Sequence, residues 1–427
     1  MRGFIFLALL CGGVLKASVG FTIRLNPAKV SMASSSEWLE RTSTVYPPQI
    51  SIGEKETLKA IGRAKVESFQ PRQYVAPFWA KNCHINTIIG SGEVQRRYFG
   101  QPQSVPPYRR ERWTTPDGDF IDIDFYQKNQ FQLSERVVVI LHGLESTSSA
   151  PLTSKMAFAM ARKGFDVAVM CFRSCSGEDN RTPGAYHLGF TDDIRFVVRA
   201  LATKYDQQGL TEPRRIYLSG FSLGGNVIAK YLGELGEEAF NLGVCGGAVA
   251  CVPFDCVASQ NKIDGGTFNR RIYSQNFLKT LIPKAERQAE KFPGIFDIDA
   301  IREIKTIGEF DDEFISKIYG FMGKEDYYTQ SSSKQYLPNV AVPLLGLNAI
   351  DDPFIDQYSL PNPAEVRAAP VRLVYHKNGG HCGFVSSLPE YQGENKASRD
   401  WLADELARFI GHIDTSSDDG AGFVPQY

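Results

Sequence analysis

RRIYLSGFSLGGN, residues 214–226, joins an apolar run to a serine flanked by glycines. The first half is typical of a buried strand, and residues 226–235 continue with a helical pattern. Ser222 therefore lies in a G-x-S-x-G motif, between Gly220 and Gly224, where a strand gives way to a helix. A sharp turn of this kind brings neighbouring backbone too close for a Cβ, so it needs small flanking residues. This context favours an exposed nucleophilic serine over a merely flexible turn.

Strand patterns and helix patterns alternate along the chain on both sides of this motif. The strand patterns occur at residues 120–125, 136–143, 166–172, 214–220, 244–253, 342–349 and 371–376. The helix patterns occur at residues 152–165, 191–205, 226–235 and 398–410. Most strand patterns are continuous apolar runs, as expected for strands that are buried on both faces. We therefore predict an α/β fold with a mostly parallel central sheet and helices on both faces.

The same patterns predict how the chain divides into segments. The alternation spans residues 75–412, after a polar N-terminal extension at 37–74. Between residues 254 and 337 the alternation gives way to helical patterns, which predict a helical cap inserted into the domain. The polar, glycine-rich tail at 413–427 is predicted to be disordered.

Residues 1–36 are predicted to be a targeting leader rather than part of the fold. Arg2 precedes an apolar run that is too short for the roughly 20 residues of a membrane-spanning helix but suits a signal peptide at 1–20. Residues 21–36 contain no acidic residue, which is typical of a transit peptide. Three destinations fit this leader: a plastid through a bipartite signal, the secretory pathway, or the ER membrane through an uncleaved anchor. A plain cytoplasmic location is not expected.

A nucleophilic serine needs a base, and the base needs a carboxylate to orient it. Among the histidines, His381 is the best candidate base because it follows the last strand pattern, at the carboxyl edge of the predicted sheet. Asp351 and Asp352 follow the strand pattern at 342–349, and Asp352 is favoured because the chain turns away from the sheet just after it. The order Ser222, Asp352, His381 is that of α/β-hydrolases and predicts an acyl-enzyme.

The oxyanion of such an intermediate needs backbone donors. In this fold they are the amide after the nucleophile, here Leu223, and an amide in the loop after an earlier strand, here Leu144 in HGLES. His142 is interpreted as structural, because the backbone of its neighbours matters more to the oxyanion. His187 is interpreted as a structural residue or as a support of the site.

Composition and charge exclude several other classes. The formal net charge of −1 lacks the basic excess of a nucleic-acid-binding protein. The eight cysteines show no zinc-binding spacing, and no phosphate-binding or dinucleotide motif occurs, so we predict neither a metal nor a cofactor. One local basic stretch is interpreted as solvated surface, with contact to lipid headgroups as the alternative. It comprises Arg96, Arg97, Arg109, Arg110 and Arg112.

Several separate strings resemble the α/β-hydrolase branch of YheT and the embryogenesis-associated proteins, the AB hydrolase 4 family. They are FWAKNCHINTI (78–88), RWTTPDGDFIDIDF (112–125), HGLES (142–146), FRSCSGEDNRTPGAYHLGFTDDI (172–194), GFSLGGN (220–226), NAIDDPF (348–354) and GGHCGF (379–384). The chain departs from the usual family pattern at Asn82–Cys83, Asn86 and Ser146, and Cys382 occupies a variable position. These departures fall in loops and leave the three candidate catalytic residues intact.

The resemblance implies a serine carboxylesterase or lipase acting on monoacylglycerols, short-chain esters or phospholipids. It relates the chain to the abhydrolase-domain lipases of animals. The cap residues Phe277, Leu278, Phe310 and Phe314 would suit an acyl chain, although core packing would use them equally. The alternatives are an acyltransferase with the same three residues and a non-catalytic lipid-binding protein. The expected partners are a small acyl ester or lipid, together with peripheral contact to a membrane.

Overall fold

The computed structural model describes residues 50–90, 92, 104–127, 132–203, 205, 210, 213–391 and 399–415. The predicted leader at 1–36, the first part of the extension at 37–49, Arg96, Arg97 and the tail from residue 416 onward lie outside the described residues. Within the described ranges, no helix combines the length and the apolar character that crossing a membrane requires.

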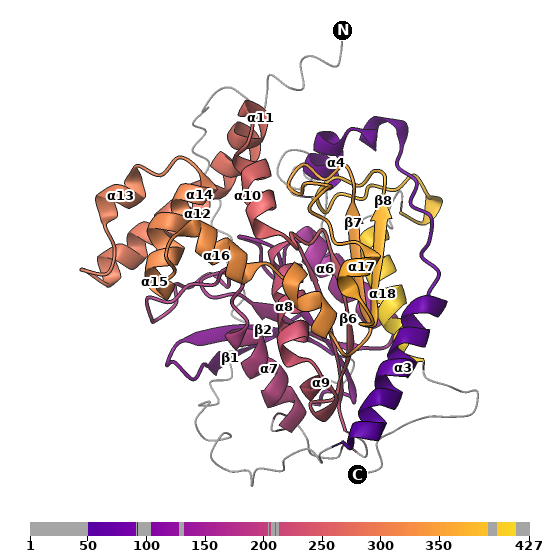
Figure 1. Cartoon of the computed structure of the whole chain (residues 1–427). Coiled ribbons are helices and arrows are strands. Elements are labelled where there is room, and N and C mark those ends of the chain that lie inside the picture. The colour runs from indigo at the N-terminus through magenta and orange to yellow at the C-terminus, as the bar shows by residue number, and fades with distance from the viewer. Residues whose placement is uncertain are drawn as a thin grey trace. The chain divides into compact units, whose positions relative to one another are not determined.

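A mostly parallel sheet forms the centre of the described chain, as predicted (Figure 1). Eight strands of the described residues lie in the order β1-β2-β4-β3-β5-β6-β7-β8. They are β1 Arg109–Thr114, β2 Phe120–Tyr126, β3 Arg136–Leu141, β4 Asp166–Cys171, β5 Arg215–Phe221, β6 Val244–Ala250, β7 Leu344–Ala349 and β8 Val371–His376. Strand β2 pairs antiparallel with β1 and β4, and the other neighbouring strands pair in parallel. The carboxyl ends of β3, β5, β6, β7 and β8 therefore lie along one edge of the sheet.

Helices cover both faces of the sheet, and β3 shows why. The covering helices are α6 Pro151–Arg162 and α18 Trp401–Asp414 on one face, and α7 Asp192–Thr203 and α8 Leu223–Leu235 on the other. Val137 and Val139 pack with α7 and α8, whereas Val138 and Ile140 pack with α6 and α18. Successive side chains of a strand point to opposite faces, so an apolar residue at every position requires cover on both.

The described part of the N-terminal extension is a helix that packs on the core, rather than a separate polar segment. Helix α3 spans Ile52–Ser68 and begins with a capping box formed by Ser51 and Glu54. Phe69, directly after it, is buried with its ring centroid 5.0 Å from that of Phe409 in α18. The sequence of α3 is mostly polar because only a narrow stripe of the helix, with Gly62 and Val66, is buried. The remaining short helices are η1 Phe78–Lys81, α4 Cys83–Gly90, α9 Glu238–Asn241, α17 Pro363–Val366 and η5 Pro389–Tyr391.

Helix α18 extends past the predicted end of the domain. Ile413 and Asp414, which the sequence assigned to the tail, belong to this helix. The Asp414 carboxylate accepts hydrogen bonds from Arg136 Nη1 over 2.9 Å and from Arg215 Nη1 and Tyr217 Oη over 2.8 Å each. These bonds connect the last turn of α18 to β3 and β5. The polar composition from which the tail was predicted does not reveal such long-range contacts.

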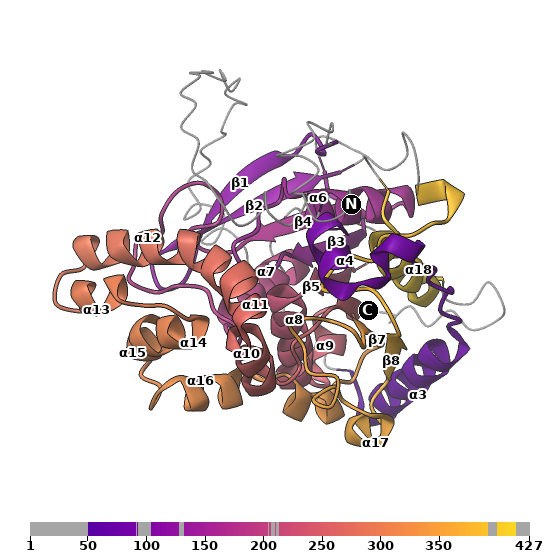
Figure 2. The same cartoon turned by 90° about the horizontal axis from the view of Figure 1, so that it is seen from above.

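Helices fill the segment between β6 and β7, as the cap prediction required. They are α10 Cys256–Asp264, α11 Thr267–Asn269, the π-helical turn η2 Arg270–Ser274, α12 Gln275–Lys291, α13 Ile298–Arg302, α14 Ile307–Phe310, the π-helical turn η3 Asp311–Ser316, α15 Lys317–Tyr319, α16 Lys324–Ser331 and η4 Lys334–Asn339. Leu278, Phe310 and Phe314 belong to their shared core cluster. Figure 2 shows α12–α16 on the side of the sheet away from α3 and α18.

The described arginines of the basic stretch are neutralised within the first hairpin. Arg110 donates to both carboxylate oxygens of Asp124, over 2.8 and 2.7 Å, and Arg112 binds Asp122 in the same manner, over 2.8 and 2.9 Å. Asp122 and Asp124 are buried, so they need these partners. The structure therefore favours a structural role for this stretch over contact with lipid headgroups.

Candidate active site

Ser222 lies on the sharp turn between β5 and α8. Its φ of 54° and ψ of −126° are backbone angles that residues other than glycine rarely adopt. A Cβ added at Gly224 would lie 2.4 Å from the carbonyl oxygen of His142, and one at Gly220 would lie 2.9 Å from that of Leu141. Both contacts are shorter than a real Cβ tolerates. Glycine at these two positions is therefore a steric requirement of the turn.

A continuous chain of hydrogen bonds joins Ser222, His381 and Asp352. Ser222 Oγ donates to His381 Nε2 over 2.9 Å, and His381 Nδ1 donates to Asp352 Oδ2 over 2.8 Å. Asp352 is completely buried, and its other oxygen accepts from the Phe354 amide over 2.7 Å. The carboxylate fixes the proton on Nδ1, which leaves Nε2 free to accept the serine proton.

The neighbouring Asp351 has a different role, which separates the two acids that the sequence left side by side. Its Oδ1 accepts from the Gly380 amide over 3.0 Å, and its Oδ2 accepts from Asn378 Nδ2 over 3.2 Å. Asp351 thus holds the loop that carries His381, while Asp352 contacts the imidazole itself.

Helix α4 supports the histidine loop from the other side, a contact that the sequence analysis did not predict. The His381 amide donates to Thr87 Oγ1 over 2.8 Å, across 294 residues of chain. The Val385 amide donates to Asn86 Oδ1 over 3.1 Å, and Asn86 is completely buried. The string FWAKNCHINTI was recognised as a family feature, but nothing local in it shows that it meets the histidine loop.

Leu144 and Leu223 are the residues whose amides are predicted to bind the oxyanion. Both residues line one cavity with Ser222. Across the described residues, neither amide donates to another protein group, so both remain available to a ligand. Leu223 begins α8, whose first amides have no partner within the helix and carry the positive end of its dipole.

Glu145 connects the oxyanion loop to the cap. It has a positive φ of 55°, and its amide donates to Tyr186 Oη over 2.9 Å. Its Oε1 accepts from Tyr186 Oη over 2.7 Å and from Lys284 Nζ of α12 over 2.8 Å. The loop that presents the Leu144 amide is therefore fixed by a cap residue.

Two other histidines, His142 and His187, are buried. His142 donates from Nδ1 to the Gly143 carbonyl over 2.8 Å and accepts the Phe172 amide at Nε2 over 3.2 Å. Burial lowers the pKa of His142 to about 4 and that of His187 to about 3. Both rings are therefore neutral near pH 7.

An apolar cavity extends from Ser222 and His381 into the cap. The empty space measures about 1080 Å³ including its open mouth. Phe277, Phe310 and Phe314 line it, whereas Leu278 packs in the cap core instead. The buried Asp311 also borders the cavity, and burial raises the pKa of its carboxyl to about 7.

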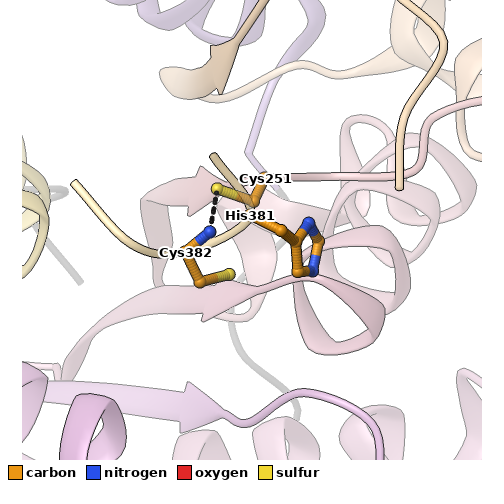
Figure 3. Close-up of side chains that lie close together, drawn as sticks. All are labelled: Cys251, His381 and Cys382. Carbon is orange, nitrogen blue, oxygen red and sulfur yellow. Dashed lines mark hydrogen bonds between the residues drawn. The ribbon is translucent and has the colours of Figure 1, made fainter. Parts of the chain in front are cut away.

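Two cysteines flank His381 (Figure 3). Cys251 follows β6 and Cys382 follows His381, and the Cys382 amide donates to Cys251 Sγ over 3.1 Å. One ligand-type atom of each of the three residues lies within 4.8 Å of the other two. Their 131-residue separation explains why cysteine spacing along the chain gave no sign of this cluster. The absence of a metal site stays a prediction.

Comparison with known proteins identifies relatives over most of the chain. It is 30% identical over 332 residues to YheT of Escherichia coli, covering 76% of this chain and 91% of YheT. It is 28% identical over 303 residues to phospholipase ABHD3 of Bos taurus, covering 70% and 71%, and 27% identical over 335 residues to the monoacylglycerol lipase of Saccharomyces cerevisiae, covering 74% and 67%. A solved Pyrobaculum calidifontis esterase is similar with a TM-score of 0.45 and 17% identity, over 86% of this chain and 100% of that one. No family model matches the chain.

A serine on the turn after β5, an acid after β7 and a histidine after β8 of such a sheet define an α/β-hydrolase. The match to YheT is more specific than this fold class. The chain belongs to the YheT and ABHD family of α/β-hydrolases, which confirms the recognition made from its sequence motifs.

Proposed function

We propose that this protein is a serine carboxylesterase or lipase that hydrolyses acyl esters through an acyl-enzyme. The observation that carries the proposal is the hydrogen-bond chain from Ser222 through His381 to Asp352, at the end of an apolar cavity. A binding protein without catalysis has no need of this chain or of the strained backbone at Ser222. The family supports the same activity, since its members include a phospholipase and a monoacylglycerol lipase.

The proposed reaction has two halves. Ser222 Oγ attacks the ester carbonyl carbon while His381 Nε2 takes the hydroxyl proton, and the imidazolium is stabilised by Asp352. The tetrahedral intermediate collapses, and His381 returns the proton to the leaving alcohol. Water then attacks the acyl-enzyme with His381 again as base, which releases the acid and restores the serine.

The amides of Leu144 and Leu223 are the proposed donors to the oxyanion of both intermediates. Each such donor typically lowers the barrier by about 3 kcal/mol. Because they are backbone groups, their placement depends on the residues that fix the two loops. For the first loop these are Glu145, Tyr186 and Lys284.

The proposed substrates are lipid esters with an acyl chain in the aromatic cavity. Phe277, Phe310 and Phe314 offer apolar surface to a chain whose carbonyl is at Ser222. Monoacylglycerols, short-chain esters and phospholipids all fit this description. Peripheral contact with a membrane belongs to the same proposal, because such lipids are found in bilayers.

A 4-nitrophenyl ester series from acetate to palmitate tests the proposal. We expect hydrolysis that falls about a thousandfold or more in Ser222→Ala. Labelling by a fluorophosphonate probe should likewise be lost. Ser174→Ala is the matched control, because Ser174 lines the same cavity but its hydroxyl pairs with Asn180 instead of a histidine. Absence of hydrolysis and of labelling in the unmodified protein would refute an esterase.

A further inference from the structure

Four large apolar side chains are exposed on η1, α4 and α11, three short segments near His381. The exposed fractions are 85% for Phe78, 40% for Trp79, 43% for Ile85 and 41% for Phe268. Single exposed hydrophobic residues are ordinary on protein surfaces, but a group of them on one face marks a contact surface. We refer to these four residues as the apolar face.

Direct contacts join the three segments that carry the apolar face. The ring of His84 in α4 lies against that of Phe268 in α11, with a centroid distance of 4.4 Å. Asn86 of α4 donates to the Ala80 carbonyl over 2.9 Å, which holds η1 beside α4. Figure 1 places α4 and α11 at the top of the view, and Figure 2, seen from above, draws both near the centre.

Three basic residues lie on or directly after the segments that carry the apolar face. Lys81, Arg270 and Arg271 are exposed, and none of them forms an ion pair with another described residue. Two acids border the neighbouring hollow: Asp351 accepts the Gly380 amide of the histidine loop, and Asp356 accepts the Tyr358 amide of its own loop. Exposed apolar residues close in sequence to basic residues without an acidic partner match an anionic bilayer surface, where each group finds its preferred environment.

The same segments that carry the apolar face also hold His381. Thr87 of α4 accepts the His381 amide, as described above. Tyr273, just after α11, packs on Phe354 with a centroid distance of 4.7 Å, and Phe354 stacks on the His381 ring at 4.1 Å. A lipid that leaves a bilayer at this face is therefore close to the reacting groups.

We propose that the apolar face docks on a bilayer that contains anionic lipid. Phe78 and Trp79 enter the boundary between headgroups and acyl chains, and Lys81, Arg270 and Arg271 contact the headgroups. The inference rests on the proposed function, because a lipid ester substrate makes a bilayer, rather than a partner protein, the fitting occupant. It assigns membrane contact to η1, α4 and α11 and not to the arginines of β1.

Phe78→Asp in the full-length chain tests the docking face, and Met322→Asp is the matched control. Met322 is 92% exposed in the cap, between α15 and α16, so its replacement makes the same chemical change away from the apolar face. Both variants are combined with Ser222→Ala, so that vesicle lipids are not consumed. Binding is measured by flotation with phosphatidylcholine vesicles, with and without phosphatidylserine. Quenching of Trp79 by brominated lipid, corrected with a Trp79→Phe variant, gives a local reading that is independent of the leader.

We expect Phe78→Asp to weaken binding to phosphatidylserine-containing vesicles about 10- to 100-fold, while Met322→Asp leaves it unchanged. Trp79 quenching should appear on vesicle addition and increase with phosphatidylserine. Equal binding by the two variants, no quenching of Trp79, or binding independent of phosphatidylserine would each overturn the proposal. Hydrolysis of soluble 4-nitrophenyl acetate by the two single variants, with Ser222 intact, is measured beside it. If Phe78→Asp keeps full activity on the soluble ester but no longer binds vesicles, the docking face is distinct from the esterase site. If the protein binds vesicles but hydrolyses no ester, the docking proposal stands and the proposed function fails.

Discussion

Lys284 of α12 carries the ion pair that joins the cap to the oxyanion loop, and Lys284→Met removes it. The Glu145 side chain is only 7% exposed and would be left without its cation, while Lys284 is 24% exposed. Truncating one partner of a fully buried pair costs about 3–5 kcal/mol. Because a quarter of the lysine faces solvent, we expect about 2–3 kcal/mol of lost stability.

The same substitution should also slow catalysis. Glu145 directly follows Leu144, and its positive φ depends on the bonds to Tyr186 and Lys284. A loop released at one of these bonds presents the Leu144 amide less accurately to the oxyanion. We expect kcat to fall about 10- to 100-fold, which is less than the loss expected when one oxyanion donor is removed completely. Lys284→Arg, which keeps the charge, should recover most of this loss.

Arg287→Met is the matched control for this prediction. Arg287 lies one turn further along α12 and also pairs with a residue outside the cap, Asp179, but the two side chains are 49% and 32% exposed. An exposed pair of this kind contributes about 1 kcal/mol or less. Urea unfolding and steady-state hydrolysis of a soluble ester measure both effects. If Lys284→Met and Arg287→Met have the same kcat, the proposed control of the oxyanion loop is wrong.

Three further predictions follow from contacts in the site. Asp352→Asn should lower kcat about 10⁴-fold, because it favours the wrong tautomer of the His381 imidazole. Asp351→Asn should lower kcat less than about tenfold, and steady-state ester hydrolysis by the two variants measures the difference. The pKa of Asp311 is about 7 in the fold against 3.8 as its ordinary value, so its stabilising effect is present below 3.8 and is lost as the pH rises through 7. Asp311→Asn should accordingly stabilise the protein by about 2 kcal/mol more at pH 8 than at pH 5 in urea unfolding, and an equal effect at both would contradict this. Zn²⁺ should inhibit ester hydrolysis of the unmodified protein at a concentration at least about tenfold lower than it needs for a Cys251→Ser, Cys382→Ser double variant. The reason is that two cysteine sulfurs, which lose their protons on binding, and a neighbouring histidine nitrogen are ligands that zinc prefers. Recovery of activity with a chelator checks that the inhibition is reversible.

Local patterns were sufficient for the strands, the helices and the turn at Ser222. A continuous apolar run predicts a strand buried on both faces wherever it falls in the chain, and β3 shows this directly. The glycines at 220 and 224 predict a tight turn because the steric limit involves only nearby backbone and the strand beside it. Chain order then placed His381 and one of two adjacent acids at the same edge of the sheet.

The tertiary structure decided what depends on the direction of a side chain or on a distant partner. Asp351 and Asp352 are equivalent in composition and position, and only the path of the loop sends one to the imidazole and the other to the Gly380 amide. Thr87 supports His381 from 294 residues away, a separation at which no periodic pattern carries information.

The sequence by itself thus determined the family, the order of the sheet-forming segments along the chain, and the candidate nucleophile and base. Each of these depends on short-range sterics, on hydrophobic period or on several motifs read together. The tertiary structure alone decided that α3 packs on the core, that a cap lysine holds the oxyanion loop, and that four apolar side chains near the site stay exposed. Burial and exposure are properties of the whole packed chain, because a side chain is covered only by residues that the fold brings to it.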